Sequence, residues 1–293
     1  MSFNVTTRRD IVKPLQYVAE GTTAATYGVT PTSPTFIAAG LNTEITLDPG
    51  IVYQKVYALG LEDYADSIKT QENYAFSLKS NIANTTLAKF GIAAVNAAGT
   101  VAEHLSFSYS KYIDGTEYYT RIVGCKNVST TLSVSRGLWE MDQVWHCQEI
   151  KDETTSAVAG ATYVSTPPTI TPLSHQDGAS PFTWNSTVYP ERRFSMTVTR
   201  DLSLLEINGN VLVQFAKAAN RNISFNVDSY KKSTALLTDY YDQTQRTASY
   251  KIGTETATFT SAKITGYRES HSGTNNEANI ESLTCEAESV AIA

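Results

Sequence analysis

The chain has 293 residues and a formal net charge of −6, and Ser or Thr occupies 66 positions, whereas charged residues make up only 18%. Abundant Thr, together with 17 Tyr, favours half-exposed sheet surfaces over helices. The acidic balance argues against tight binding to nucleic acid, and no apolar run approaches the roughly 20 residues that span a bilayer. The first residues lack the apolar stretch of a secretory signal, so the three cysteines predict reduced thiols rather than a disulfide framework.

The first 35 residues are expected to form an irregular N-terminal arm. Its apolar residues are isolated from one another and include Phe3, Val5, Ile11, Val12 and Leu15. A segment of this kind has no core of its own, so we expect it to become ordered only by docking on a neighbour.

Residues 36–150 are predicted to form a first β domain. Residues 41–47 alternate between apolar and polar, which is typical of a half-buried antiparallel strand. A long connection without a clean period follows at 48–72, and a short helix is expected at 83–90, with Gly91 at its C-terminal stop. Further strands are expected at 74–78, 105–113, 117–127 and 138–150.

Residues 151–181 are predicted to be a linker, because they contain four Pro, many small residues and no periodicity. A second β domain is then expected over 182–293. Its first strand carries Phe194, Met196 and Val198 on one face, a long connection follows at 201–221, and a short helix is expected at 232–241. Further strands are expected at 223–227, 246–252, 255–265 and 278–290.

The two domains are interpreted as copies of one plan. With a constant shift of 138 residues, the Gly-Thr-Glu at 115–117 falls on that at 253–255, and Cys147 falls on Cys285. Upstream the shift grows to roughly 149 to 153, which matches Phe76 with Phe225, Leu87 with Leu236 and Asp48 with Asp201. A longer loop at 91–106 in the first copy accounts for the change of shift. Each Gly-Thr-Glu also predicts a tight hairpin, because Gly supplies the positive φ that such turns need.

No catalytic, cofactor-binding or metal-binding residue is predicted. The chain lacks GxGxxG, GxxxxGK[ST] and GxSxG, and its four histidines (His104, His146, His175 and His271) stand singly, without metal-site spacing. Cys147 and Cys285 are interpreted as small apolar groups in a core, and nothing near Cys125 would activate it as a reactive thiol. We therefore expect a protein that is not an enzyme and needs no cofactor.

The order of elements resembles the tail tube protein of long-tailed bacteriophages and archaeal tailed viruses. The second copy carries the pattern most clearly, in the segments FSMTVTRDLS, NISFNVDSYKKSTALLTDYYDQ, YKIGTETATFTSAKI and ANIESLTCEAES. The resemblance covers nearly all of 182–293 and, more loosely, 36–150. The arm at 1–35 and the linker at 151–181 have no counterpart in minimal tube proteins.

This resemblance implies an all-β fold in which each domain is a β-sandwich or partial barrel with one short helix. Inner sheets of neighbouring domains would join into a ring around a lumen, and the connections at 48–72 and 201–221 would reach into the next ring. With two domains per chain, a trimer with pseudo-sixfold symmetry is favoured over a hexamer. The implied protein is a tail tube subunit located in the virion and synthesised in the host cytoplasm. It would contact other tail proteins but no membrane.

The charge distribution agrees with a conduit for DNA. Residues 36–150 carry 8 basic and 12 acidic residues, and residues 182–293 carry 11 and 12. A neutral to acidic wall lets double-stranded DNA pass, whereas a basic wall would hold it.

Three alternatives remain at this stage. The protein could be another tail component of the same fold, such as a hub or tube terminator, or an enzyme on a β-sandwich. It could also be a carbohydrate-binding adhesin that stacks sugars on Tyr or on Trp139, Trp145 and Trp184. Against the adhesin, Trp139 and Trp145 share one strand face with Met141, which favours a core or a subunit interface.

Overall fold

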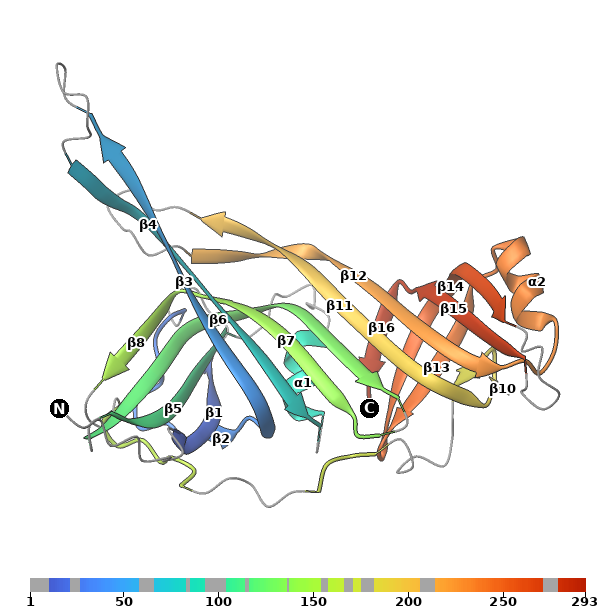
Figure 1. The fold of residues 1–293 in the computed structure, drawn as a ribbon, viewed down its shortest axis with the longest axis horizontal. Helices are drawn as coiled ribbons and strands as arrows, with labels where there is room; N and C mark the ends of the chain where they lie inside the picture. Colours follow the sequence, from blue (N-terminus) through green and yellow to red (C-terminus); the bar gives the residue numbers. More distant parts are fainter. Residues whose placement is uncertain are drawn as a thin grey trace, which may run out of the picture.

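The computed structural model describes residues 11–21, 27–57, 66–82, 85–92, 104–113, 116–135, 137–153, 158–165, 171–174, 182–205, 214–270 and 279–293. Over these residues the fold is all-β, with antiparallel strand pairs and two short helices, as the sequence predicts (Figure 1). The elements of the first half are β1 (Ile11–Gly21), β2 (Ile37–Ala38), β3 (Leu41–Val56), β4 (Asp66–Asn81), α1 (Thr86–Ile92), β5 (His104–Ile113), β6 (Thr116–Val134), β7 (Glu140–Cys147) and β8 (Glu149–Glu153). Those of the second half are β9 (Thr183–Trp184), β10 (Thr187–Val188), β11 (Glu191–Leu205), β12 (Gln214–Tyr230), α2 (Ala235–Asp242), β13 (Arg246–Ile252), β14 (Glu255–Ser270), β15 (Ile280–Glu286) and β16 (Ser289–Ile292).

One large sheet, here called the main sheet, runs through both halves of the chain. Its eight described strands lie in the order β3-β4-β7-β6-β11-β12-β15-β14. Each half adds a smaller sheet, made by β1, β2, β5 and β8 with the start of β6, or by β9, β10, β13 and β16 with the start of β14. Figure 1 shows the result as two β modules side by side, which share the main sheet.

The core lies between the main sheet and the smaller sheets. Along β4, for example, Tyr74, Phe76 and Leu78 are buried while the residues between them are half-buried, which is the alternation expected of a strand with one wet face. Aromatic side chains fill both modules, and in the second module Phe194 stacks on Tyr250 with ring centroids 4.0 Å apart. Buried side chains of the two modules form one continuous cluster, so the halves share a hydrophobic core.

The long connections expected at 48–72 and 201–221 are mostly strand, so this expectation is wrong. β3 and β4 stay paired out to Val56 and Asp66, and β11 and β12 stay paired out to Leu205 and Gln214. The period of two is absent at residues 51–56 and 66–70 because these side chains are all exposed and have no buried face. We call Gly50–Val56 with Asp66–Asn73 the first arm, and Asp201–Leu205 with Gln214–Asn220 the second arm. Both extend toward the same side of the molecule (Figure 1).

The described part of the N-terminal segment is not irregular either. β1 pairs with β5 at the edge of the first small sheet, and its Leu15 and Tyr17 are buried in the core. Parts of the Pro-rich segment also lie against the first module, since Thr162 exchanges backbone hydrogen bonds with Pro34 and Phe36. Both segments are therefore ordered by contacts with the first module of the same chain.

Two predicted strands and the predicted end of the first helix differ from the structure. β5 and β13 lie where they were expected, whereas the single strands expected at 138–150 and 278–290 are each two strands, because the chain passes there from the main sheet to a small sheet. Gly91 does not end α1 but lies within it. A Cβ at Gly91 would collide with the Thr130 hydroxyl, so glycine is required by close packing of α1 on β6.

Candidate functional site

The paired strands of the two halves carry β-bulges at equivalent positions. In β3 a bulge lies between Asn42 and Glu44, and in β11 one lies between Glu191 and Arg193. Aligning these bulges (residue 42 on residue 191) gives an offset of 149 residues. The same offset places Phe76 on Phe225 and the first residue of α1 on the first residue of α2.

A second set of bulges fixes the rest of the alignment. β6 has a bulge between Asn127 and Ser129, and β14 has one between Ile264 and Gly266, an offset of 137. Gly124 and Ser261, also 137 residues apart, both have positive φ (65° and 51°). Strand order, bulges and backbone conformation therefore repeat in the two halves.

This register corrects two of the sequence matches. Trp145 pairs with Phe76, and Cys285 pairs with Phe225, so the residue equivalent to Cys285 is Trp145 and not Cys147. With the offset of 149, Asp48 is equivalent to Thr197 rather than to Asp201. The errors arise because bulges change the residue count locally, and a low-identity alignment does not reveal bulges.

The two halves join where β6 pairs with β11, a contact that we call the seam. Six antiparallel pairs run from Ser129–Thr199 to Val134–Phe194. On the core side of the seam, Leu132 and Met196 are fully buried. On the opposite side, the hydroxyl groups of Thr131 and Thr197 are hydrogen-bonded at 3.0 Å.

Helix α1 of the first half reinforces the seam. The Lys89 ammonium lies 2.7 Å from the Glu255 carboxylate at the start of β14, and the Arg200 guanidinium donates to the Gly91 carbonyl at 3.0 Å. Burial, together with the neighbouring Arg221, lowers the pKa of Arg200 to about 10. Burying a charged group costs free energy unless the group is hydrogen-bonded, so the buried Arg200 guanidinium depends on the Gly91 carbonyl.

The main sheet ends on each side in an unpaired edge. Among the described residues, β3 pairs only with β4, and Gly266–Ser270 of β14 pairs only with β15. At the β3 edge Ile45 and Leu47 are partly exposed, whereas the equivalent Phe194 and Met196 are fully buried at the seam. Open strand edges of this kind are templates for pairing with another chain.

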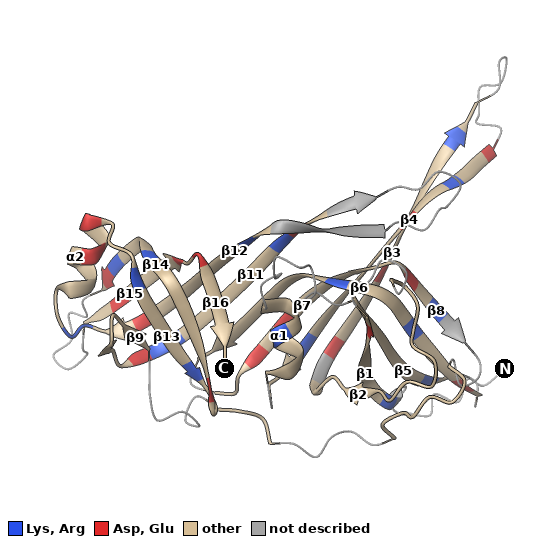
Figure 2. Ribbon diagram, turned by 180° about the vertical axis from the view of Figure 1, so that it is seen from behind, with Lys and Arg blue, Asp and Glu red and all other residues tan. Residues whose placement is uncertain are grey.

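The side of the main sheet that faces away from the core is polar but has few charges; we call it the open face. Its uncharged side chains are mostly Ser, Thr and Asn, namely Thr46, Ser77, Ser129, Thr131, Ser133, Ser195, Thr197, Thr199, Asn222, Ser224, Asn226, Ser282 and Thr284. Its acidic side chains (Glu44, Asp48, Glu140, Asp142, Asp228 and Glu286) outnumber its basic ones (Lys79, Arg193, Lys263 and Arg268). Figure 2 shows charges scattered along these strands without a basic cluster.

The first arm exposes apolar side chains to solvent. Between 39% and 65% of each of these side chains is accessible: Ile51, Val52, Tyr53, Val56, Tyr57 (just beyond β3) and Ile68. A two-stranded ribbon is only marginally stable by itself. A cluster of six exposed apolar side chains on such a ribbon marks an interaction surface. The first arm is therefore suited to lie against another protein surface.

The described histidines and the cysteines do not come together in a reactive arrangement. His104 is buried with its ring against Tyr27, burial lowers the pKa of His146, and His175 and His271 lie outside the described residues. The three thiols are buried, and burial raises the pKa of Cys125 and of Cys285, which disfavours the reactive thiolate. Within the described ranges no group of three or more His, Cys, Asp or Glu side chains is placed to hold a metal ion.

The three Trp side chains are also unavailable for ligand stacking. Trp139, Trp145 and Trp184 are each 1% exposed. Trp184 donates its ring N–H to the Asp239 carboxylate of α2 at 2.8 Å, and Arg246 donates to the same carboxylate at 2.9 Å. These aromatic residues are part of the shared hydrophobic core.

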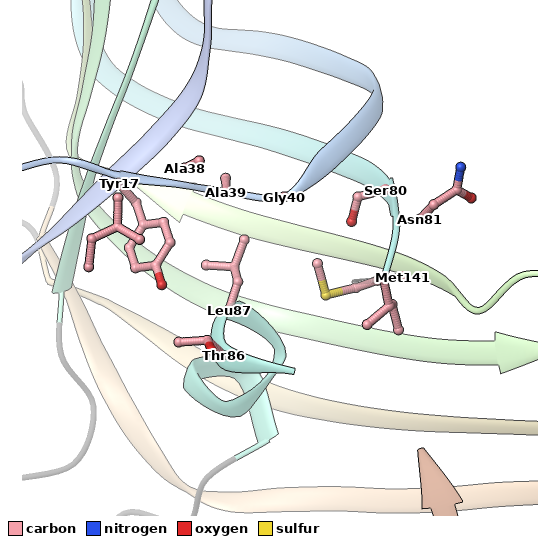
Figure 3. A pocket seen from close by; sticks show the side chains of 11 residues that line it. Tyr17, Ala38, Ala39, Gly40, Ser80, Asn81, Thr86, Leu87 and Met141 are labelled. Atoms are coloured by element: carbon pink, nitrogen blue, oxygen red, sulfur yellow. The ribbon is translucent and has the colours of Figure 1, made fainter. Parts of the chain in front are cut away.

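Cavities lie on both sides of the main sheet in the described part of the chain. One of about 70 Å³ lies between β1, β2, β4, β7 and α1, where Tyr17, Leu87 and Met141 converge (Figure 3). This volume is well below the roughly 300 Å³ at which sites for small molecules begin. A depression of about 380 Å³ lies on the open face beside Lys79, Thr131 and Asp142.

Two further findings bear on function. Neither helix of the described residues is long and apolar enough to cross a membrane. No protein-family model matches the chain, and no curated protein matches its sequence. Function is therefore inferred from the seam, the two edges, the open face and the first arm.

Proposed function

We propose that this protein is a structural virion protein, the tail tube subunit of a long-tailed virus, whose rings stack around a lumen through which viral DNA passes. The observation that carries the proposal is that one chain contains a strand-pairing seam between like halves and also ends in two unpaired edges of the same kind. A contact between unlike edges is heterologous, and it closes into a ring when its rotation divides a full turn.

If every junction between chains repeats the seam, the number of strands sets the circumference of the ring. Three chains supply six modules and three times eight strands, or 24 strands. With strands about 4.8 Å apart and tilted by about 40°, the sheet has a circumference of about 150 Å. Inward side chains about 5 Å long then leave a channel roughly 40 Å wide, which admits a DNA duplex.

The open face suits the wall of such a channel. Its Ser, Thr and Asn side chains present hydrogen-bonding groups that water also satisfies, and its few charges are mainly acidic. Affinity for DNA depends on Lys and Arg neutralising phosphates, so this surface holds DNA weakly and lets it slide. The open face therefore supports a conduit rather than a DNA-binding site.

The arms supply the contact between rings. Both leave the main sheet toward the same side (Figure 1), and the first arm carries exposed apolar side chains that a neighbouring ring would cover. Burial of apolar surface usually drives such association, and it contributes a free energy of about 25 cal/mol for each Å² buried.

The alternatives have less support. An adhesin that stacks sugars on Trp is disfavoured by the burial of all three Trp side chains. A hub or tube terminator would share the fold but would form rings that do not stack repeatedly.

Negative-stain microscopy and mass measurement of the purified protein at high concentration test the proposal. We expect rings or hollow rods of uniform width, with a ring mass of three chains. A ring of six chains would overturn the assignment of two ring modules to each chain, and single rings that never stack would favour a hub or terminator. A protein that stays monomeric at all concentrations would overturn the proposal.

A further inference from the structure

We infer that neighbouring copies of this chain join through one defined strand register, in which Gly266–Ser270 of β14 pairs antiparallel with Thr46–Gly50 of β3 in a second copy. This inference specifies the contact on which the proposed ring depends. It commits the two unpaired edges to each other, rather than to a different protein.

The register follows from the seam and the two offsets. β6 residues map onto β14 by adding 137, and β11 residues map onto β3 by subtracting 149. The seam pair Thr131–Thr197 thus becomes Arg268 opposite Asp48. The flanking pairs Ser129–Thr199 and Ser133–Ser195 become Gly266 opposite Gly50 and Ser270 opposite Thr46.

Charge complementarity supports this register independently of the alignment. Asp48 and Arg268 are both exposed on the open face, and neither has an ion pair within the described part of the chain. Directly opposite residues of an antiparallel pair have Cβ atoms about 5 Å apart, where opposite charges attract. Pairing β3 with β3, or β14 with β14, would bring together like charges instead, so the charges favour the head-to-tail contact.

The end of each helix lies at an equivalent place beside its junction. At the seam, Arg200 and Arg221 donate to the carbonyls of Gly91 and Ile92 at the end of α1. The equivalent positions are Ile51 and Glu72 on the first arm, and Tyr240 and Tyr241 at the end of α2. The Arg200–Gly91 contact therefore maps onto Ile51 and Tyr240, where an apolar contact would replace the polar one of the seam. Glu72, in the place of Arg221, is already bound by Lys69 and Tyr74 of its own chain.

The remaining pairs of the proposed contact are compatible with it. Leu47 would lie opposite Glu269, whose carboxylate is already 2.6 Å from the Lys231 ammonium and so needs no new partner. Pro49 lacks an N–H, but an edge strand is where a sheet tolerates Pro. Pairing would complete the burial of Ile45 and Leu47, as at the seam.

Disulfide trapping tests the register directly. The double variant D48C/R268C should form covalent oligomers of up to three chains on oxidation, because opposite residues have the Cα spacing that a disulfide needs. The variant T131C/T197C, at the equivalent pair of the seam, is the matched control and should form only an intrachain disulfide. Native thiols contribute little background, because all three cysteines are buried.

A register slip would give a different pattern. If rings form but T46C/R268C crosslinks between chains in place of D48C/R268C, the inferred register is wrong while the tube proposal stands. Rings without crosslinking in either variant would likewise overturn the register only. Absence of rings in the unmodified protein would overturn both.

Charge reversal gives a second readout without new cysteines. D48R and R268D should each raise the concentration needed for ring formation by about tenfold, and D48R/R268D should restore it. The control E140R changes an exposed acid of the open face away from both edges and should assemble like the unmodified protein. Equal effects of D48R and E140R, or no rescue in the double variant, would overturn the register.

Discussion

Thr131 of β6 and Thr197 of β11 share a hydrogen bond of 3.0 Å between their hydroxyl groups, although 66 residues separate them in the chain. Beneath this pair, Leu132 and Met196 are fully buried. The two modules therefore cannot separate without exposing a shared core, and the seam is part of the fold rather than a flexible junction.

The burial of equivalent residues predicts unequal effects of truncation. Met196→Ala at the seam should lower the free energy of unfolding of the monomer by about 3 kcal/mol, because it leaves a cavity in a packed core. Leu47→Ala, at the equivalent position of the open edge, should cost about 1 kcal/mol, since Leu47 is already partly exposed. Urea denaturation of dilute protein measures both values, and equal losses would contradict the difference between seam and edge.

The Asp239 carboxylate of α2 predicts a pH-dependent contribution to stability. Burial by itself would raise its pKa, but hydrogen bonds from Arg246 and Trp184 outweigh burial and hold the pKa below the ordinary value of 3.8. The stabilisation is therefore present at pH values above the ordinary pKa and is lost as the pH falls through the lowered pKa.

Asp239→Asn should accordingly lower the free energy of unfolding by about 2 kcal/mol at pH 7, through the loss of charge-assisted hydrogen bonds. The difference from the unmodified protein should shrink below pH 4. Urea titrations at pH 7 and pH 3 measure it, and a difference that stays constant between them would exclude the carboxylate charge as its source.

Shortening the first arm should block stacking and spare the ring. Because Val52 pairs with Gln71, replacing residues 52–71 by Asn-Gly keeps the register of β3 with β4 and closes the hairpin with a tight turn. Micrographs should then show rings without rods. Rods that grow normally would show that this arm is not the contact between rings.

The exposed apolar side chains of that arm can be tested separately. Tyr53→Ser with Ile68→Ser leaves the length of the hairpin unchanged and removes two side chains that are more than half exposed. The monomer should keep its stability, whereas rods should require a higher protein concentration. Unchanged stacking would assign the contact to the backbone of the arm.

Lysines on the open face should create a DNA-binding surface inside the proposed conduit. Ser195→Lys, Asn226→Lys and Ser282→Lys in one variant should give tubes that retain duplex DNA with an affinity that falls steeply between 50 and 200 mM salt. Thr258→Lys with Thr260→Lys is the control, because these exposed residues lie on β14 where it belongs to the small sheet. Anisotropy of labelled DNA measures binding, and equal retention by both variants would argue against a lumen lined by the open face.

The sequence predicts those elements whose side chains alternate between core and water. β13 is predicted with its observed bounds because Ala248, Tyr250 and Ile252 are buried in alternation and Gly253 supplies the turn, with φ of 63°. The outer part of the first arm, residues 51–56 with 66–70, escapes prediction for the opposite reason, since a strand with no buried face leaves no period in its sequence.

The candidate assembly site depends on relationships that a single sequence does not display. Nothing in residues 194–199 indicates that their neighbour is β6, and the bulge at Asn42–Glu44, which sets the offset, leaves no mark in composition. β1 is hidden by Pro14, a residue more typical of turns, although Leu15 and Tyr17 already alternate with polar Gln16. Long-range pairing decides these features, and local propensity does not.

Because both arms of the chain leave the main sheet on one side, the proposed stack of rings would have two chemically different ends. One end would present the apolar first arms, and the other would present the surface that these arms contact. Elongation of the proposed tube would therefore have a direction, and a single capping protein specific for one end would be sufficient to fix where it starts and how long it becomes.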